Sequence, residues 1–292
     1  MNADREKMEK IDRIIEMVNN SEISSIKQTL TRIINTVNDP ESSAKDLRNI
    51  IETDPPLTAK LLKLANSAFY GYPKTINEIQ EAIVCIGFET VRELALSQKV
   101  CELFKKDEEI DGYSRMSLWK HSVAVALCSK LIYRREFRER GENIYAAGLL
   151  HDIGIIILDQ FMHDIFVDIL EISRSENNNL ATVETTALNY NHADVGKALA
   201  EDWNFPDEIV NAIAYHHEPD SVGDEYTKIS SVIFTSDCLV QDYNIGFCEA
   251  PYRDKPLFQK CLKKLNIKEK AINLIVKEVQ EEIIKMERAE WF

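Results

Sequence analysis

Residues 148–159, GLLHDIGIIILD, place a histidine and an aspartate side by side inside an otherwise apolar run. Such a run is typical of a buried helix, where an unpaired carboxylate costs several kcal/mol or shifts its pKa. His151 and Asp152 therefore need partners from elsewhere in the chain, and the fold must bring those partners to them.

The composition of the whole chain favours an all-α protein. Of its 292 residues, 45% are hydrophobic, which allows a substantial core, but only 9 are Gly and 8 are Pro, too few for a β-sandwich with many tight turns. Apolar residues recur with the period of a helix along nearly the whole chain. We predict a charged amphipathic segment at residues 1–20 and a final amphipathic helix at 267–288.

Capping residues and helix breakers predict several element boundaries. Ser43 is placed as the N-cap of one helix, and Pro55-Pro56 opens the next. Gly87 separates two short helices, and a longer helix runs from near Ser117 to about residue 135. Residues 245–265 are predicted to be rich in turns.

Five histidines and two aspartates fall on the apolar faces of predicted helices. His121, for example, shares a stripe with Leu118 and Val125. The inward-facing polar residues are His121, His151, Asp152, His192, His216, His217 and Asp237. A single buried histidine is more often a hydrogen-bonded core residue than a ligand, but seven such groups together need partners. The sixth histidine, His163, is assigned no role.

A metal ion would satisfy these groups, because it neutralises carboxylates and accepts imidazole nitrogens. Two ions could share Asp152 as a bridge. A mixed set without thiolates favours a divalent transition metal, with Fe or Mn first and Zn or Ni second, over Mg²⁺ or a structural zinc site. Glu184 is a candidate acceptor for His192, although a plain surface glutamate is an equal alternative. The alternative for the whole group is a polar core without metal.

The charge and cysteine content restrict the partners and the compartment. The formal net charge is −14, and the basic cluster at residues 134–140 is interleaved with glutamates, so no nucleic-acid partner is expected. The six cysteines form no C-x-x-C pair, which is typical of a reducing compartment. No apolar signal core or 18-residue apolar stretch was found, so we predict a cytoplasmic protein that does not span a membrane.

The order of these polar residues resembles that of the HD superfamily of metal-dependent phosphohydrolases. His121, His151-Asp152 and Asp237 follow the superfamily pattern, and His192 with His216-His217 is similar to its dinuclear HD-GYP branch. The stretches IIETDPPLTAKLLKLANSAFYG (50–71) and INEIQEAIVCIGFETVREL (76–94) resemble a narrower relative, the HDOD (HD-related output) domain, over about residues 22–220. That resemblance implies a multi-helical, bacterial domain that is generally regulatory.

The resemblance also implies two metal sites. One would take His121, His151, Asp152 and Asp237; the other would take Asp152, His192, His216 and His217. In an active enzyme a bridging water or hydroxide would attack a phosphodiester. Asp152 would then be indispensable for catalysis.

Three departures from the active HD-GYP pattern weaken the catalytic interpretation. Ile155 stands where a lysine would grip the phosphate, and Ser117 replaces a glutamate four residues before His121. The stretch HHEPDSVGDEY (216–226) lacks the Gly-Tyr-Pro signature, and a literal Gly-Tyr-Pro at 71–73 lies too far upstream to supply it. A lost electrostatic contact of this kind costs roughly 10²–10³ in rate.

We therefore expect a signalling module that retains a metal site and binds a protein partner or a nucleotide-like ligand. The alternatives are a metal-dependent phosphodiesterase acting on a nucleotide or cyclic dinucleotide, and a purely structural interaction protein. The predicted organisation is an N-terminal extension (1–21), an HDOD helical lobe (22–112), a metal-site lobe (113–245) and a C-terminal turn and helix (246–292). That helix could also mediate oligomerisation.

Overall fold

The structure is a computed structural model that describes residues 2–38, 43–67, 69–104, 110, 112–141, 143–248, 254–289 and 291. These residues are arranged in helices and connecting turns, and no strand occurs among them beyond an isolated bridge between Ile110 and Tyr113. The predicted all-α class is therefore confirmed.

The helices follow one another along the chain. In order they are α1 (Asn2–Asn19), α2 (Ser24–Asn38), α3 (Ala44–Glu52), α4 (Pro55–Ala65), α5 (Ile79–Ile86), α6 (Phe88–Cys101), η1 (Glu102–Phe104), α7 (Arg115–Ile132), η2 (Tyr133–Phe137), α8 (Ile144–Leu150), α9 (Ile153–Phe161), α10 (His163–Ser175), α11 (Leu180–Leu188), α12 (His192–Asp202), α13 (Asp207–Ala214), α14 (Asp224–Asp242), α15 (Lys255–Lys264) and α16 (Glu269–Arg288).

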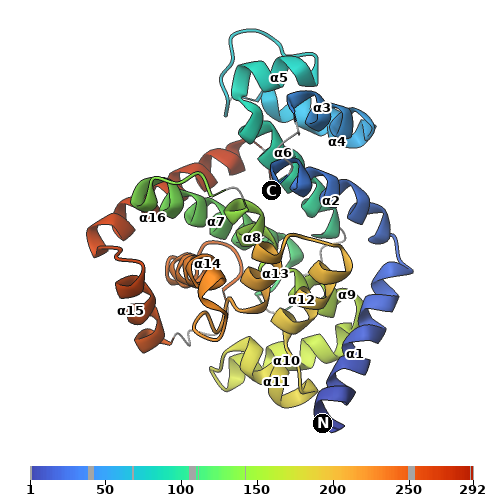
Figure 1. Cartoon of the computed structure of the whole chain (residues 1–292), viewed down its shortest axis with the longest axis vertical. Helices are drawn as coiled ribbons and strands as arrows, with labels where there is room; N and C mark the ends of the chain where they lie inside the picture. The colour runs from blue at the N-terminus through green and yellow to red at the C-terminus, as the bar shows by residue number, and fades with distance from the viewer. Residues whose placement is uncertain are drawn as a thin grey trace.

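Helices α3, α4 and α5 form one end of the molecule, and α6 leads from them into the body (Figure 1). The body is built around α7, which packs against α8, α14 and α16, while α12 packs against both α9 and α13. Helices α10 and α11 lie at the opposite end from α3–α5, and α1 runs along one side of the body (Figure 1). A single hydrophobic core joins both ends.

Glycines allow the central helices to approach closely. A Cβ atom added to Gly148 in α8 would lie 2.8 Å from the Ala126 Cα of α7, and one added to Gly154 in α9 would lie 1.9 Å from the His192 carbonyl oxygen of α12. Real Cβ atoms do not approach other atoms so closely, so the crossings of α8 with α7 and of α9 with α12 require glycine.

Most of the predicted helix boundaries are confirmed. Asp46 accepts a hydrogen bond from the Ser43 amide at the start of α3, and Asp54 caps α4 just before Pro55. Gly87, with φ at +93°, separates α5 from α6. The prediction of turns throughout 245–265 is wrong, because α15 forms there; its amphipathic face buries Phe258 and Cys261-Leu262.

Residues 144–161 are long and apolar enough to cross a membrane by composition, but 89% of that window is buried inside the fold. The chain also turns at His151-Asp152, which separates α8 from α9. The stretch that contains the GLLHDIGIIILD sequence is therefore the core of this fold. Its polar pair lies at the turn between two buried helices.

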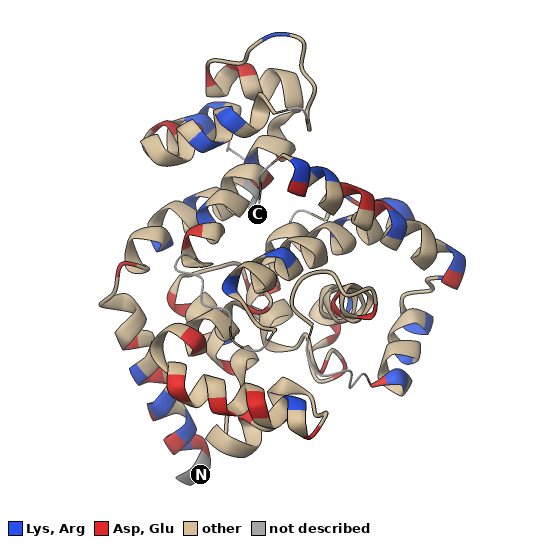
Figure 2. Cartoon of the chain, turned by 180° about the vertical axis from the view of Figure 1, so that it is seen from behind, with Lys and Arg blue, Asp and Glu red and all other residues tan. Residues whose placement is uncertain are grey.

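The apolar stripe of the C-terminal helix, α16, packs against the rest of the same chain. The predicted residues Ile272, Ile275, Val279 and Ile283 are buried, and α16 packs on α7. An oligomer through this helix stays a prediction, as do the proposed lobe boundaries. The basic cluster at 134–140 forms ion pairs with acidic residues of α6 and α16. Basic and acidic residues are interspersed along the helices (Figure 2).

Candidate metal centre

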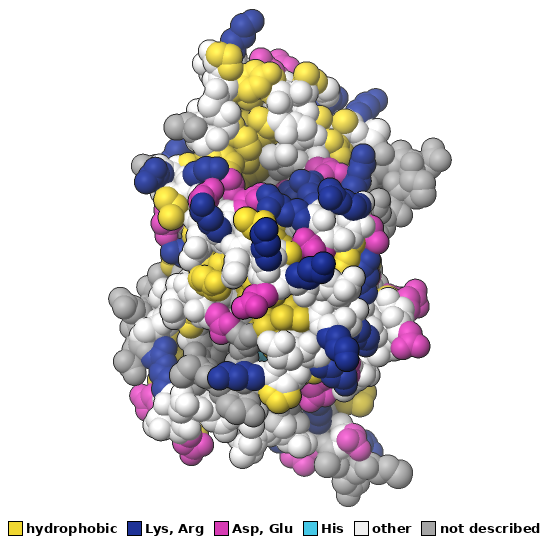
Figure 3. Space-filling model, turned by 90° about the vertical axis from the view of Figure 1, so that its left-hand side faces the viewer, with side chains coloured by type: hydrophobic (Ala, Val, Ile, Leu, Met, Phe, Trp, Pro, Cys, Tyr) yellow, Lys and Arg dark blue, Asp and Glu magenta, His cyan; other side chains and the backbone are white. Residues whose placement is uncertain are grey.

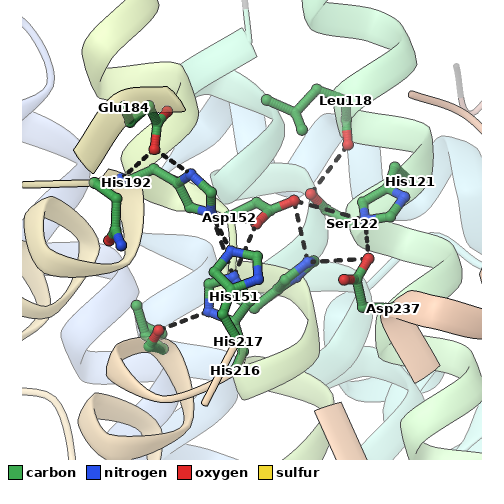
Figure 4. Close-up of polar contacts among 12 residues, drawn as sticks. Leu118, His121, Ser122, His151, Asp152, Glu184, His192, His216, His217 and Asp237 are labelled. Carbon is green, nitrogen blue, oxygen red and sulfur yellow. Dashed lines mark hydrogen bonds and ion pairs between the residues drawn. The ribbon is translucent and has the colours of Figure 1, made fainter. Parts of the chain in front are cut away.

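Five separate elements bring the seven predicted polar residues to one place (Figure 4). α7 supplies His121, the turn between α8 and α9 supplies His151 and Asp152, and the first residue of α12 is His192. The remaining residues come from the turn after α13 and from α14; they are His216, His217 and Asp237. Six of the seven are buried, and His217 is half-buried. His163, which the sequence left without a role, is elsewhere and contacts Asp159.

Asp152 lies between two groups of histidines. Its Oδ2 atom is 3.1 Å from His151 Nε2 and 3.6 Å from His121 Nε2. Its Oδ1 atom faces the other way, 3.4 Å from His216 Nε2 and 3.6 Å from His192 Nε2. A carboxylate with one oxygen toward each group is placed to bridge two cations.

The first group joins His121, His151 and Asp237 around Asp152 Oδ2. His121 Nε2 lies 3.1 Å from Asp237 Oδ1, and His151 Nε2 lies 4.0 Å from the same oxygen. Both Nε2 atoms are buried, and neither has a hydrogen-bond partner among the described residues. These ring nitrogens thus converge with carboxylate oxygens on a shared space, where a cation would satisfy all of them.

The second group joins three imidazoles around Asp152 Oδ1. His192 Nε2 is 3.4 Å from His216 Nε2 and 2.7 Å from His217 Nε2. Three ring nitrogens this close are the ligand atoms of one ion or members of a hydrogen-bonded chain. The donor set of both groups, imidazole and carboxylate without thiolate, fits a divalent transition metal, so the residues present can hold the predicted ions.

Hydrogen bonds from outside the centre fix the orientation of the rings. Glu184 accepts hydrogen bonds from both the His192 amide and the His192 Nδ1 atom, at 2.8 and 2.7 Å. It is fully buried, which confirms its predicted contact and excludes the surface alternative. The Nδ1 atoms of His151 and His216 lie 2.8 and 2.7 Å from backbone carbonyl oxygens. In all three rings Nε2 is left to face the centre, an arrangement typical of metal-binding histidines.

The two carboxylates of the centre are held ionised by their neighbours. Burial alone would raise the pKa of Asp152, but the imidazole of His151, followed by those of His216 and His192, lowers the pKa well below its usual value. Burial would likewise raise the pKa of Asp237, but the imidazole of His121, followed by that of His151, outweighs burial and lowers this pKa below its usual value. Burial and the adjacent imidazoles hold the pKa of His217 well below its usual value, so this ring stays neutral and able to bind a metal.

A cleft of about 720 Å³ reaches the centre at His217 and Asp237. Its walls come from α11, from the C-terminal half of α14, and from residues 248–257 where they are described. Viewed from the side of α15 and α16, the surface is hollowed and a histidine is visible inside (Figure 3). The protein therefore gives a small molecule a route to an otherwise buried site.

The positions that depart from the active pattern have structural roles here. Ile155 is fully buried and is absent from the cleft lining, so no side chain from that position reaches the cleft. The Ser117 hydroxyl donates to the Ser114 carbonyl in the cap of α7, and the Ser117 carbonyl accepts from the Phe247 amide.

Two contacts of the centre were missed by the sequence reasoning. Gln241 donates to Asp237 Oδ1 at 2.9 Å from one helical turn away, a spacing that could have been noticed. Gly246, with φ at +80°, sits so close to α7 that a Cβ there would lie 2.4 Å from the His121 amide nitrogen. No local signal reveals this second contact, because it joins residues more than a hundred positions apart.

The sequence comparisons identify relatives over most of the chain. The model of the HDOD domain family matches residues 23–219. A protein of Treponema pallidum (strain Nichols) is 24% identical over 236 residues, which cover 80% of this chain and 45% of that protein. The chain thus spans less than half the length of that relative.

Solved structures share the fold over 90% of the chain. An HDOD domain protein of unknown function from Geobacter sulfurreducens is 27% identical, with a TM-score of 0.75 and 90% of its own length covered. A presumed signal transduction protein from Marinobacter aquaeolei VT8 is 22% identical with a TM-score of 0.74, over 58% of its length. A presumed phosphohydrolase from Shewanella amazonensis SB2B is 21% identical with a TM-score of 0.68, over 93% of its length.

Proposed function

This chain belongs to the HDOD domain family, and from that premise we propose that it is an intracellular signalling module that binds a ligand or a protein partner at a metal centre. One ion would be held by His121, His151, Asp152 and Asp237, and the other by Asp152, His192, His216 and His217. Fe or Mn is the first choice of metal and Zn or Ni the second, because the ligands are imidazoles and carboxylates.

The observation that carries this proposal is the placement of Asp152, whose two oxygens face two different histidine groups at 3.1–3.6 Å. A purely structural polar core would pair each buried nitrogen with an acceptor in hydrogen-bonding geometry. Here two buried Nε2 atoms, those of His121 and His151, have no such partner. A cation at each end of Asp152 accounts for both features.

The walls of the cleft favour a regulatory role over catalysis of phosphodiester hydrolysis. Catalysis at a phosphate depends on positive groups aimed at the developing charge. Ile155 is buried away from the cleft, and no Lys or Arg occurs among the described residues that line it. A phosphodiester would therefore find no Lys or Arg side chain on the walls among the residues that the structure describes.

The chain's own residues can serve the centre in three ways. Glu184 holds the tautomer of His192, and Gln241 fixes Asp237. Burial keeps bulk water from most of the ligands, while the cleft admits a ligand beside His217. When bound, ions of this class polarise an oxygen ligand and lower the pKa of a coordinated water.

The proposal is tested by elemental analysis of the full chain, purified anaerobically without added metal and again after titration with Mn²⁺. About two transition-metal ions per chain are expected from the two ligand groups. Hydrolysis of bis(p-nitrophenyl) phosphate is measured on the same samples, and no turnover above buffer is expected. A chain that takes up no metal under either condition would contradict the proposal.

A metal-dependent phosphodiesterase is the second candidate function, because all seven predicted ligands converge and a cleft reaches them. In that case Asp152 would be the residue that catalysis cannot lose. Turnover by the wild type that disappears in Asp152→Ala, at equal thermal stability, would favour this candidate. Turnover that survives the substitution would point to a contaminating enzyme instead.

A further inference from the structure

Helix α12, whose first residue is His192, is held at both ends by the two N-terminal helices. Near its start, Lys7 Nζ of α1 lies 2.8 Å from Asp194 Oδ1. At its end, Lys27 Nζ of α2 lies 2.7 Å from Asp202 Oδ2. All four side chains are exposed to a similar extent, between 29% and 34%. The two ion pairs are therefore alike in length and exposure, and they differ in which end of α12 they hold.

The ion pair at the start of α12 is connected to the cap of that helix. Asp194 Oδ2 accepts a hydrogen bond from the Asn191 amide at 3.0 Å, and Asn191 Oδ1 accepts one from the Asp194 amide at 3.1 Å. The Asn191 side-chain amide also donates to Thr185 Oγ1 of α11 at 3.4 Å. A single carboxylate thus links Lys7 of α1 to the residue that precedes His192.

The orientation of the His192 ring depends on where the first turn of α12 lies. Glu184 of α11 accepts hydrogen bonds from the His192 amide and from its Nδ1 atom, at 2.8 and 2.7 Å. The Nε2 atom then lies 3.6 Å from Asp152 Oδ1 and 2.7 Å from His217 Nε2. Metal–ligand distances tolerate deviations of only roughly 0.2 Å. A small shift of this turn would therefore weaken metal binding by the second group.

Helix α1 lies before residues 23–219, which the HDOD family model matches, and yet it belongs to the core. Its buried side chains follow helical spacing; they are Ile11, Ile14, Ile15 and Val18. α1 packs on α12 and on α9 (Figure 1). Lys7 lies one turn before Ile11 on the same side of the helix. The apolar stripe that docks α1 therefore also brings Lys7 to the start of α12.

From these contacts we propose that Lys7 is a positioning residue for His192, and that α1 thereby sets the affinity of the second ligand group for its ion. The first group takes His121 and Asp237 from α7 and α14, which pack on each other, so its affinity does not depend on Lys7. The inference rests on the proposed function, because the affinity is for the ions of that function. It extends the function by naming the element that controls one of the two ions. A signal that detached α1 from α12 would release the second ion before the first.

The direction of the effect separates positioning from a simple effect of charge. Lys7 is positively charged, so its removal would by Coulomb attraction alone strengthen the binding of a cation nearby. Positioning predicts the opposite, because the first turn of α12 would lose one of the contacts that fix it. A weaker affinity after removal of Lys7 therefore identifies positioning.

Two matched variants test the proposal. Lys7→Gln and Lys27→Gln each remove one charge and one ion pair of α12, and Mn²⁺ binding to each full chain is measured by calorimetry. His217→Ala, which lacks a ligand of the second group only, identifies the binding step of that group. Lys7→Gln is expected to weaken this step about threefold, the size that a partly exposed ion pair can supply. Lys27→Gln and the conservative Lys7→Arg are expected to leave it unchanged, and the step of the first group should be the same in all three.

A second measurement does not depend on metal. Hydrogen exchange of the backbone amides at 191–194 is followed by mass spectrometry in the metal-free chain. Lys7→Gln is expected to exchange about threefold faster than the wild type in this segment, because the cap of α12 has lost a contact. Lys27→Gln is expected to exchange there as the wild type does.

The outcomes separate this inference from the proposed function. A wild type that binds no Mn²⁺ would overturn both. If the wild type binds Mn²⁺, unchanged or tighter binding of the second ion by Lys7→Gln would overturn the inference alone. Equal weakening by Lys7→Gln and Lys27→Gln would do the same, since it would reflect a general loss of stability in α12. The inference also fails if the wild type shows no binding step that His217→Ala removes.

Discussion

Two buried clusters in this molecule contain an aspartate close to histidine, and they satisfy it in opposite ways. Asp159 in α9 accepts hydrogen bonds from Arg115 at 2.6 and 3.2 Å, from the Tyr113 hydroxyl at 2.8 Å, and lies 2.9 Å from His163 Nδ1. Each of these neighbouring groups gives a hydrogen bond to the Asp159 carboxylate. Asp152, seven residues earlier, faces four imidazole nitrogens, two of which have no hydrogen-bond partner.

A lowered pKa does not distinguish the two clusters. Burial raises the pKa of both carboxyl groups, and in both cases the neighbours outweigh it. What differs is the state of the neighbours, because Arg115 carries a permanent charge while an imidazole must be neutral to bind a metal. Ring nitrogens that face carboxylate oxygens without a hydrogen bond, and not the presence of a buried aspartate, mark the cluster that can take a ligand.

The largest difference is expected from removing each aspartate in turn. Asp152→Ala should abolish binding of both ions, because it removes the shared ligand. Asp159→Ala should keep full metal content but lower the free energy of unfolding by about 3 kcal/mol, since it strips a largely buried Arg115 of its carboxylate. Metal analysis and urea denaturation check both variants. If Asp159→Ala lost metal while keeping native stability, the two clusters would not differ in the way described above.

The helix crossing beneath the centre gives the next largest effect. Gly154→Ala would force its Cβ into the His192 carbonyl of α12, 1.9 Å away, and should destabilise the fold by about 3 kcal/mol or prevent folding. The control is Gly223→Ala, since an added Cβ there meets nothing within 4 Å. This variant should change the unfolding free energy by less than about 0.5 kcal/mol. Equal melting temperatures for the two variants would refute the proposed crossing.

A smaller, local effect is expected at Glu184. Glu184→Gln keeps the shape of the side chain but weakens its hydrogen bonds to His192, so affinity should fall about 10–100-fold for the ion of the second group. The ion of the first group should be bound as in the wild type. Competition with a chelator, followed by metal analysis, measures the affinity of each ligand group for its ion. A parallel loss of both ions would mean that Glu184 supports the fold and not one site.

The smallest effect concerns the acid stability of the Asp159 cluster. The pKa of Asp159 is lowered below its ordinary value of 3.8, chiefly by Arg115 and Tyr113 against the opposing effect of burial. Its contribution to stability is therefore fully present above pH 3.8 and is lost as the pH falls through the lower folded-state pKa. In metal-free protein, Asp159→Asn should flatten the decline of stability in that acidic window. An unchanged slope would show that Asp159 does not titrate with unfolding.

Much of the fold follows from local sequence features. The caps at Ser43 and Asp54, the break at Gly87 and the stripe of α16 each depend on residues a few positions apart, and each is found where it was predicted or nearby. The exception is α15. Its amphipathic pattern spans only ten residues, and the prediction gave more weight to the turn-forming residues around it.

The seven residues of the candidate centre could also be predicted from the helical periodicity of the sequence, because an apolar stripe shows which face of a helix is buried. Periodicity does not show which other helix packs on that face. The placement of Asp152 between two histidine groups, the contact of Gly246 with α7 and the walls of the cleft join segments far apart in sequence.

The sequence alone thus determined the helical class and the identity of the inward-facing histidines and aspartates, because both depend on spacing within single helices. Only the tertiary structure decided which of them meet, which oxygen of Asp152 faces which group, and where the cleft opens. Those properties depend on helix crossings, and two of the crossings are set by backbone contacts at Gly148 and Gly154 that no side-chain pattern encodes.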